Sequence, residues 1–125
     1  MRITMKLASA LAEISQQTTR HCKEDYLYEL VSISTALDEG REYVLTTRGT
    51  GADSMSRFGE YKTLEEGITQ CQWSLGVDCV FVFKAIADWR YGFEIDIVNV
   101  NLDKSTMYAL TNGLDCRGIK FNVVK

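Results

Sequence analysis

The spacing of apolar residues predicts two helices in the first third of the chain. Leu7, Leu11 and Ile14 recur at helical spacing, so residues 5–17 are expected to form the first helix. A second helix is expected over residues 23–38, where Gly40 is placed to end it in a left-handed conformation. Its broad inner side is predicted to carry Leu27, Leu30, Val31, Ser34 and Leu37.

Two further helices are predicted from capping residues. Thr63 and Glu66 have the spacing of a capping box, and the helix that begins there is expected to end at Gly76. Asp103 is placed to cap a short helix, which the pair Asn112–Gly113 is expected to close. The chain contains no proline, so glycine and polar residues must supply every break between elements.

Four segments have the pattern of β-strands. Residues 42–48 are β-branched and aromatic, and residues 77–86 form an apolar run of strand length. Residues 93–100 alternate between apolar and acidic positions, and the short link "ADWRYG" before them favours an antiparallel hairpin. The tail alternates again, with three side chains expected to point inward: Ile119, Phe121 and Val123.

The resulting order, ααβαββαβ, predicts an α+β fold. We expect residues 1–125 to form a single domain with a four-stranded, mostly antiparallel sheet and helices packed on one face. A length of 125 residues and a hydrophobic fraction of 46% suit a soluble domain with one hydrophobic core. No apolar run is long enough for a membrane helix, and the first residues lack the pattern of a signal peptide, so a cytoplasmic protein is expected.

The charge distribution argues against a nucleic-acid-binding surface. The net charge is −3, and no dense basic face is evident in the sequence. Residues 24–66 are the most acidic part, which is most simply interpreted as a solvated helix face. The four cysteines are expected to be free thiols, since a core of this size needs no disulfides in a reducing compartment.

No catalytic or metal-binding motif is present. The single histidine, His21, precedes Cys22, and neighbours on a helix point about 100° apart. The nearest cysteine pair, Cys71 and Cys79, is separated by seven residues, which is unlike a zinc site. We therefore predict no enzyme, no metal and no cofactor. A cysteine–histidine pair involving Cys116 or another thiol is left as a remote alternative.

Glu94 and Asp96 are the one carboxylate pair with a defined geometry. Alternate residues of a strand lie on the same face, about 6–7 Å apart. Such a pair can perform acid–base chemistry in a small hydrolase or hold a hard cation. The simpler interpretation, which we favour, is the solvated face of an antiparallel strand.

The stretch 48–59, "RGTGADSMSRFG", is predicted to be a long loop. Its glycines permit backbone N–H groups to approach an anion, and its arginines suit phosphate. It matches neither dinucleotide-binding nor P-loop patterns. The alternative function drawn from it is a protein that sequesters a nucleotide or other phosphorylated molecule, with these ligand-binding residues: Arg48, Gly49, Thr50, Gly51, Ser54 and Arg57.

The hairpin link offers a different function. Trp89, Arg90 and Tyr91 are of the residue types most enriched at protein-binding hot spots. Two interpretations fit these residues: they contact a partner, or Trp89 folds back over the sheet edge with Arg90 stacked on it. The leading hypothesis is a non-enzymatic binding protein that docks on, and inhibits or modulates, another protein through these three residues.

In general character the chain resembles small accessory proteins of phages and mobile elements, although it contains no family motif. The hairpin residues favour a protein partner, whereas the charge distribution and the lack of a long apolar run argue against nucleic acid and membrane. A homo-oligomer is compatible with either binding hypothesis, because the edges of a four-stranded sheet offer a route to one.

Overall fold

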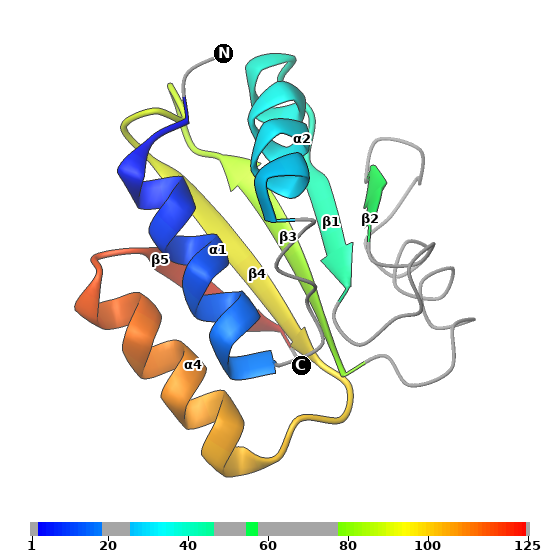
Figure 1. Ribbon diagram of the computed structural model, residues 1–125, viewed down its shortest axis with the longest axis vertical. Helices are drawn as coiled ribbons and strands as arrows, with labels where there is room; N and C mark the ends of the chain where they lie inside the picture. Colours follow the sequence, from blue (N-terminus) through cyan, green and yellow to red (C-terminus); the bar gives the residue numbers. More distant parts are fainter. Residues whose placement is uncertain (1–2, 19–25, 47–54, 58–77, 125) are drawn as a thin grey trace.

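A computed structural model describes residues 3–18, 26–46, 55–57 and 78–124, and three of the predicted helices and the four predicted strands lie within them (Figure 1). The described elements, in chain order, are α1 (Met5–Thr18), α2 (Tyr26–Asp38), β1 (Tyr43–Thr46), β2 (Met55–Arg57), β3 (Cys79–Ala85), β4 (Phe93–Asn99), α4 (Lys104–Cys116) and β5 (Lys120–Val124). The helix predicted from Thr63 lies outside the described residues.

One mixed sheet forms the centre of the fold, in the strand order β2-β1-β3-β4-β5. The pairs β1–β2, β1–β3 and β3–β4 are antiparallel, whereas β4 and β5 are parallel. Parallel neighbours require a crossover, and α4 supplies it between β4 and β5. The α+β class and the mostly antiparallel sheet are therefore confirmed.

The three-residue strand β2 corrects the prediction for residues 48–59, which were expected to be loop throughout. Met55–Arg57 pairs with β1 in a register that sets Tyr43 opposite Arg57. Three residues are too few to show an alternation of apolar and polar positions. The strand can still form, because strand pairing uses backbone groups and places no demand on side-chain polarity. The four predicted strands are present, and β2 extends the sheet by one strand at its edge.

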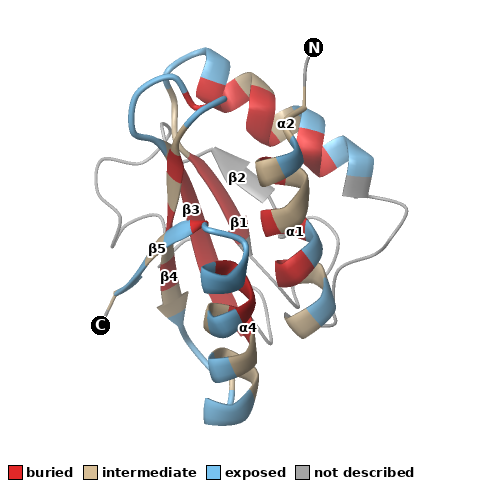
Figure 2. Ribbon diagram, turned by 90° about the vertical axis from the view of Figure 1, so that its left-hand side faces the viewer, coloured by how far each residue is buried: buried red, intermediate tan, exposed pale blue. Residues whose placement is uncertain are grey.

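The described helices pack on one face of the sheet (Figure 2). Alternate residues of the central strands, including Phe81, Phe83, Ile95 and Ile97, join the buried cluster beneath the helices. The alternation predicted for β4 is confirmed: Phe93, Ile95 and Ile97 are buried, and the acidic residues between them are half-buried. This one-sided packing confirms the layer arrangement expected from the sequence.

Helix α2 ends as expected but is rotated relative to the prediction. Gly40 has a φ of 73°, the left-handed conformation that ends helices at glycine. However, Leu27 is 64% exposed and Val31 is also exposed, whereas Ile33 is fully buried. The buried side is centred on Leu30, Ile33 and Leu37, so two apolar residues expected in the core lie on the surface.

Helix α4 is longer than predicted. Asp103 caps it as expected, with its side chain accepting a hydrogen bond from Thr106 N at 2.6 Å. The helix passes through Gly113 and ends after Cys116, where Gly118 has a φ of 66°. Gly113 was expected to close the helix, but its conformation there is helical, and its lack of a side chain serves packing instead.

That packing is a contact between α1 and α4, the helix clamp, formed by Glu13, Gly113 and Arg117. The Glu13 side chain is only 5% exposed and lies where a Cβ atom on Gly113 would be. Arg117 Nη1 pairs with Glu13 Oε2 at 3.0 Å and also donates to the carbonyl of Gly113. Gln17 donates to the second carboxylate oxygen. Glycine is therefore required at position 113 for a buried carboxylate to fit between the helices.

Strand β5 is less buried than its alternation predicts. Ile119 is buried and Phe121 packs against the core cluster, as expected. Val123, predicted to point into the core, is 46% exposed. It lies on the last strand of the sheet, where β4 covers one side and no described strand covers the other.

Candidate functional site

The turn between β3 and β4 holds the residues that the sequence marked for partner binding. Ala85 and Phe93 pair across the base of the hairpin. The N–H groups of Tyr91 and Gly92 both donate to the carbonyl of Asp88, at 2.9 and 3.1 Å. The predicted antiparallel hairpin is therefore confirmed, and its tip has a defined backbone conformation.

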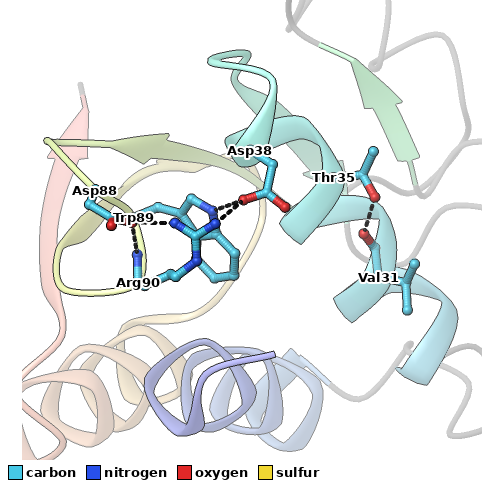
Figure 3. Close-up of polar contacts among 6 residues, drawn as sticks. All are labelled: Val31, Thr35, Asp38, Asp88, Trp89 and Arg90. Carbon is cyan, nitrogen blue, oxygen red and sulfur yellow. Dashed lines mark hydrogen bonds and ion pairs between the residues drawn. The ribbon is translucent and has the colours of Figure 1, made fainter. Parts of the chain in front are cut away.

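Trp89 fastens this tip to the body of the protein. Its side chain is 3% exposed and belongs to the core cluster. The indole Nε1 donates to Asp38 Oδ1, at the end of α2, at 2.6 Å (Figure 3). This hydrogen bond spans 51 residues of sequence and satisfies the one polar group of a buried indole.

Arg90 closes the same contact from outside. Its guanidinium carbon lies 5.6 Å from the centre of the Trp89 ring, within cation–π range. Its two terminal nitrogens pair with Asp88 at 2.8 Å and with Asp38 at 3.2 Å (Figure 3). We call Asp38, Trp89 and Arg90 the hairpin anchor. It joins α2 to the turn and leaves the Arg90 side chain only partly exposed.

Asp88 stabilises the turn through its ionised form. Its carboxylate accepts from the backbone N–H of Arg90 at 3.1 Å as well as from the guanidinium. The backbone hydrogen bond, followed by the Arg90 side chain, lowers the pKa of Asp88. The turn is therefore most strongly held when Asp88 is charged.

The three predicted contact residues have different roles in this geometry. Trp89 is buried and folds back with Arg90 stacked on it, which is the geometry of the second interpretation, and contact of these residues with a partner stays a prediction. Tyr91 is 85% exposed, the most exposed of the large hydrophobic side chains described, and Ile86 at the start of the turn is also exposed. No sequence signal distinguishes Ile86, because an apolar residue at the end of an apolar strand has the pattern of a core residue.

The predicted carboxylate pair lies on the sheet face opposite the core cluster, in a sheet-face cluster of Lys84, Glu94, Asp96 and Asn122. Lys84 Nζ pairs with Asp96 at 2.7 Å and with Glu94 at 3.6 Å. Asn122 donates to both carboxylates, at 3.2 and 3.0 Å. Burial alone would lower the pKa of Lys84, but the hydrogen bond to Asp96 and the nearby acidic side chains raise it.

Glu42 lies within electrostatic range of this cluster. Burial raises its pKa, the charge of Lys84 opposes the rise, and that of Asp96 adds to it. The carboxylates predicted to share a face are thus bridged by a lysine and an amide from neighbouring strands. Sequence spacing gave Glu94 and Asp96, but only the strand register brings Lys84 and Asn122 to them. The arrangement is a network in which one lysine and one amide bridge two carboxylates.

The cysteines and the predicted ligand loop divide between described and undescribed parts. Cys79 is buried and free, and burial raises its pKa to about 12, so its thiol is protonated and inert. Cys116 is exposed and free. Of the predicted ligand residues only Arg57 lies in a described element, β2, and the rest (Arg48, Gly49, Thr50, Gly51 and Ser54) lie outside the described residues, as do His21, Cys22 and Cys71.

Comparisons with known proteins do not extend this picture. The chain matches no family model, and searches of curated proteins and of solved structures found no match. Among the described residues, no helix is long and apolar enough to cross a membrane. Within the same residues, no group of three or more histidine, cysteine or acidic side chains is arranged to hold a metal ion.

Proposed function

We propose that this protein is a non-catalytic binding protein that docks on another protein through the hairpin tip and modulates or inhibits it. The observation that carries the proposal is the exposure of Tyr91 on a hairpin tip that the hairpin anchor fastens to α2. A large aromatic side chain that stays exposed gains little hydrophobic free energy when the protein folds. It can gain that free energy when a partner buries it.

The anchor supports this proposal by reducing the cost of binding. Ordering a loop on association reduces affinity, and a loop already fixed by its own structure avoids that cost. Here Trp89 and Asp38 hold the tip against α2, and Asp88 holds its backbone. Tyr91, with Ile86 beside the base of the turn, is the contact element, whereas Trp89 and Arg90 position it.

The proposal is tested by placing a photo-crosslinking residue at the tip. The variant Tyr91→p-benzoylphenylalanine is irradiated in lysate of the cells that make the protein, and adducts are identified by mass spectrometry. The matched control is Tyr108→p-benzoylphenylalanine, since Tyr108 is also highly exposed but lies on α4. A discrete protein adduct specific to position 91 supports the proposal, and adducts indistinguishable between the two positions contradict it.

A further inference from the structure

Strand β5 ends the sheet with an unpaired side. One side pairs with β4, and no described strand lies beyond the other. Its five residues include a single charge, Lys120, and Val123 is exposed. An edge of this kind presents a row of backbone donors and acceptors that fits another extended strand.

Helix α4 borders this edge with a polar stripe. In α4, Gly113 faces α1 through Glu13, and the buried Leu110 and Leu114 face the sheet. Positions i, i+4, i+7 and i+11 of a helix lie on one side. The residues of this edge stripe, on the side of the helix opposite Gly113 and therefore away from α1, are Lys104, Tyr108, Thr111 and Asp115. Figure 1 shows α4 on the β5 side of α1.

The two charged residues of the edge stripe are placed unfavourably relative to the dipole of α4. Lys104 is the first residue of α4 and Asp115 lies in its last turn. A helix N-terminus favours negative charge and a C-terminus favours positive charge, so both side chains stand at the less favourable end. Each would find an opposite charge if a second α4 lay antiparallel beside the first.

We propose that a second copy of this chain pairs with the first through the edge stripe and the free side of β5. A two-fold axis normal to the sheet joins the two β5 strands antiparallel about Asn122. It sets Phe121 opposite Val123 of the other copy, covering the exposed valine. The same axis sets Lys104 opposite Asp115 and Tyr108 opposite Thr111, so every contact occurs twice.

The two halves of this interface agree on where the axis lies. The midpoint of the edge stripe falls between residues 109 and 110, about 13 Å from Gly118 at 1.5 Å of rise per residue. Asn122 lies four residues after Gly118, which is also about 13 Å at about 3.3 Å per residue. A single axis therefore satisfies helix and strand pairing together, as a closed dimer requires.

This dimer is independent of the proposed docking function. The hairpin turn leads into β4 at the end of the sheet where β5 begins, since Glu94 pairs with Lys120. The two-fold axis thus places the two hairpin tips at opposite ends of a ten-stranded sheet, away from the interface.

The experiment is sedimentation equilibrium of the full chain over micromolar to millimolar concentrations. Wild type is expected to approach twice the 14.2 kDa chain mass. Asp115→Lys and Lys104→Asp each juxtapose like charges and are expected to weaken dimerisation about tenfold or more at low salt. Combining Lys104→Asp with Asp115→Lys restores opposite charges and is expected to restore the dimer.

Two further variants separate folding, docking and dimerisation. Both charge exchanges agree with the α4 dipole, so circular dichroism should show an intact fold. Val123→Lys tests the strand independently of α4 and should also yield monomers, whereas Tyr91→Ala should remain dimeric whether or not it docks on a partner. A wild-type monomer at every concentration overturns the proposal, as does a dimer indifferent to both charge exchanges and to Val123→Lys.

Discussion

The helix clamp and the hairpin anchor both hold a carboxylate against an arginine across elements distant in sequence. They differ in whether an aromatic side chain beside the contact stays exposed. In the clamp, Glu13 is enclosed by α1 and α4, and the groups around it bond to one another. In the anchor, Asp38 is satisfied by Trp89 and Arg90, but Tyr91 beside them is 85% exposed. The difference indicates that the clamp serves the fold alone, while the anchor also presents a surface.

The largest effect is expected from removing the anchor's indole. Trp89→Ala deletes a buried aromatic side chain and the hydrogen bond to Asp38, which should lower the free energy of unfolding by about 3–5 kcal/mol. Urea denaturation followed by circular dichroism measures it. Trp89→Phe, which keeps an aromatic ring but loses the hydrogen bond, should cost less. A loss below about 1 kcal/mol for Trp89→Ala would mean that the indole does not fasten the tip.

Tyr91 should behave in the opposite way. Because its side chain is exposed, Tyr91→Ala should change the free energy of unfolding by no more than about 0.5 kcal/mol. If Tyr91 is a hot spot, the same change should weaken binding to the crosslinked partner by about 2 kcal/mol or more. Isothermal titration calorimetry with that partner measures the loss, and Leu27→Ala, another exposed apolar position, is the control. Equal affinities for wild type and Tyr91→Ala would remove Tyr91 from the interface.

The helix clamp predicts that the effect of Gly113→Ala on stability changes sign when Glu13 is removed. Gly113→Ala places a Cβ atom on the Glu13 carboxylate and should destabilise the protein by about 1–3 kcal/mol, since Glu13 must leave its partners. In a Glu13→Ala background the space is free, and alanine should instead stabilise the helix by up to about 1 kcal/mol. Denaturation of the four proteins of this cycle measures the coupling. A loss of similar size in both backgrounds would show that Glu13 is not the obstacle.

Gly113 also illustrates what the sequence could and could not predict. Local patterns gave most element positions, the Asp103 cap, the Gly40 turn and the hairpin. A glycine after Asn112 has the local pattern of a helix end. The contact that requires glycine there is with Glu13, a hundred residues earlier, and local sequence does not reveal it. The helix rotation that exposes Leu27 has the same cause, since several apolar sides of α2 were available and packing against the sheet decided among them.

The candidate site shows the same division. Residue type identified Trp89, Arg90 and Tyr91, but their roles depend on Asp38, which no spacing rule links to position 89. Likewise Glu94 and Asp96 follow from alternation, whereas Lys84 and Asn122 reach them through the register of β3 and of the parallel strand β5. Strand β2 was missed because three residues are too few to show a period.

The smallest effect, and the most local, concerns pH. Asp88 in the hairpin turn and Asp103 at the start of α4 each have a pKa lowered from 3.8, chiefly by backbone N–H donors, Arg90 for the first and Thr106 for the second. A lowered folded pKa means that each carboxylate stabilises the fold fully above 3.8 and loses this contribution as pH falls through the folded value. The expected result is an acid-induced loosening at both positions.

Amide NMR shifts measure this directly, because the two donors report on their own acceptors. The Arg90 and Thr106 N–H resonances should titrate with midpoints below 3.8, and Asp88→Asn should abolish the titration at Arg90 while leaving that at Thr106 unchanged. Asp103→Asn should do the reverse. If the Arg90 amide titrates at 3.8 or above, the turn is not held by ionised Asp88, and the rigidity on which the display of Tyr91 depends must come from Trp89 alone.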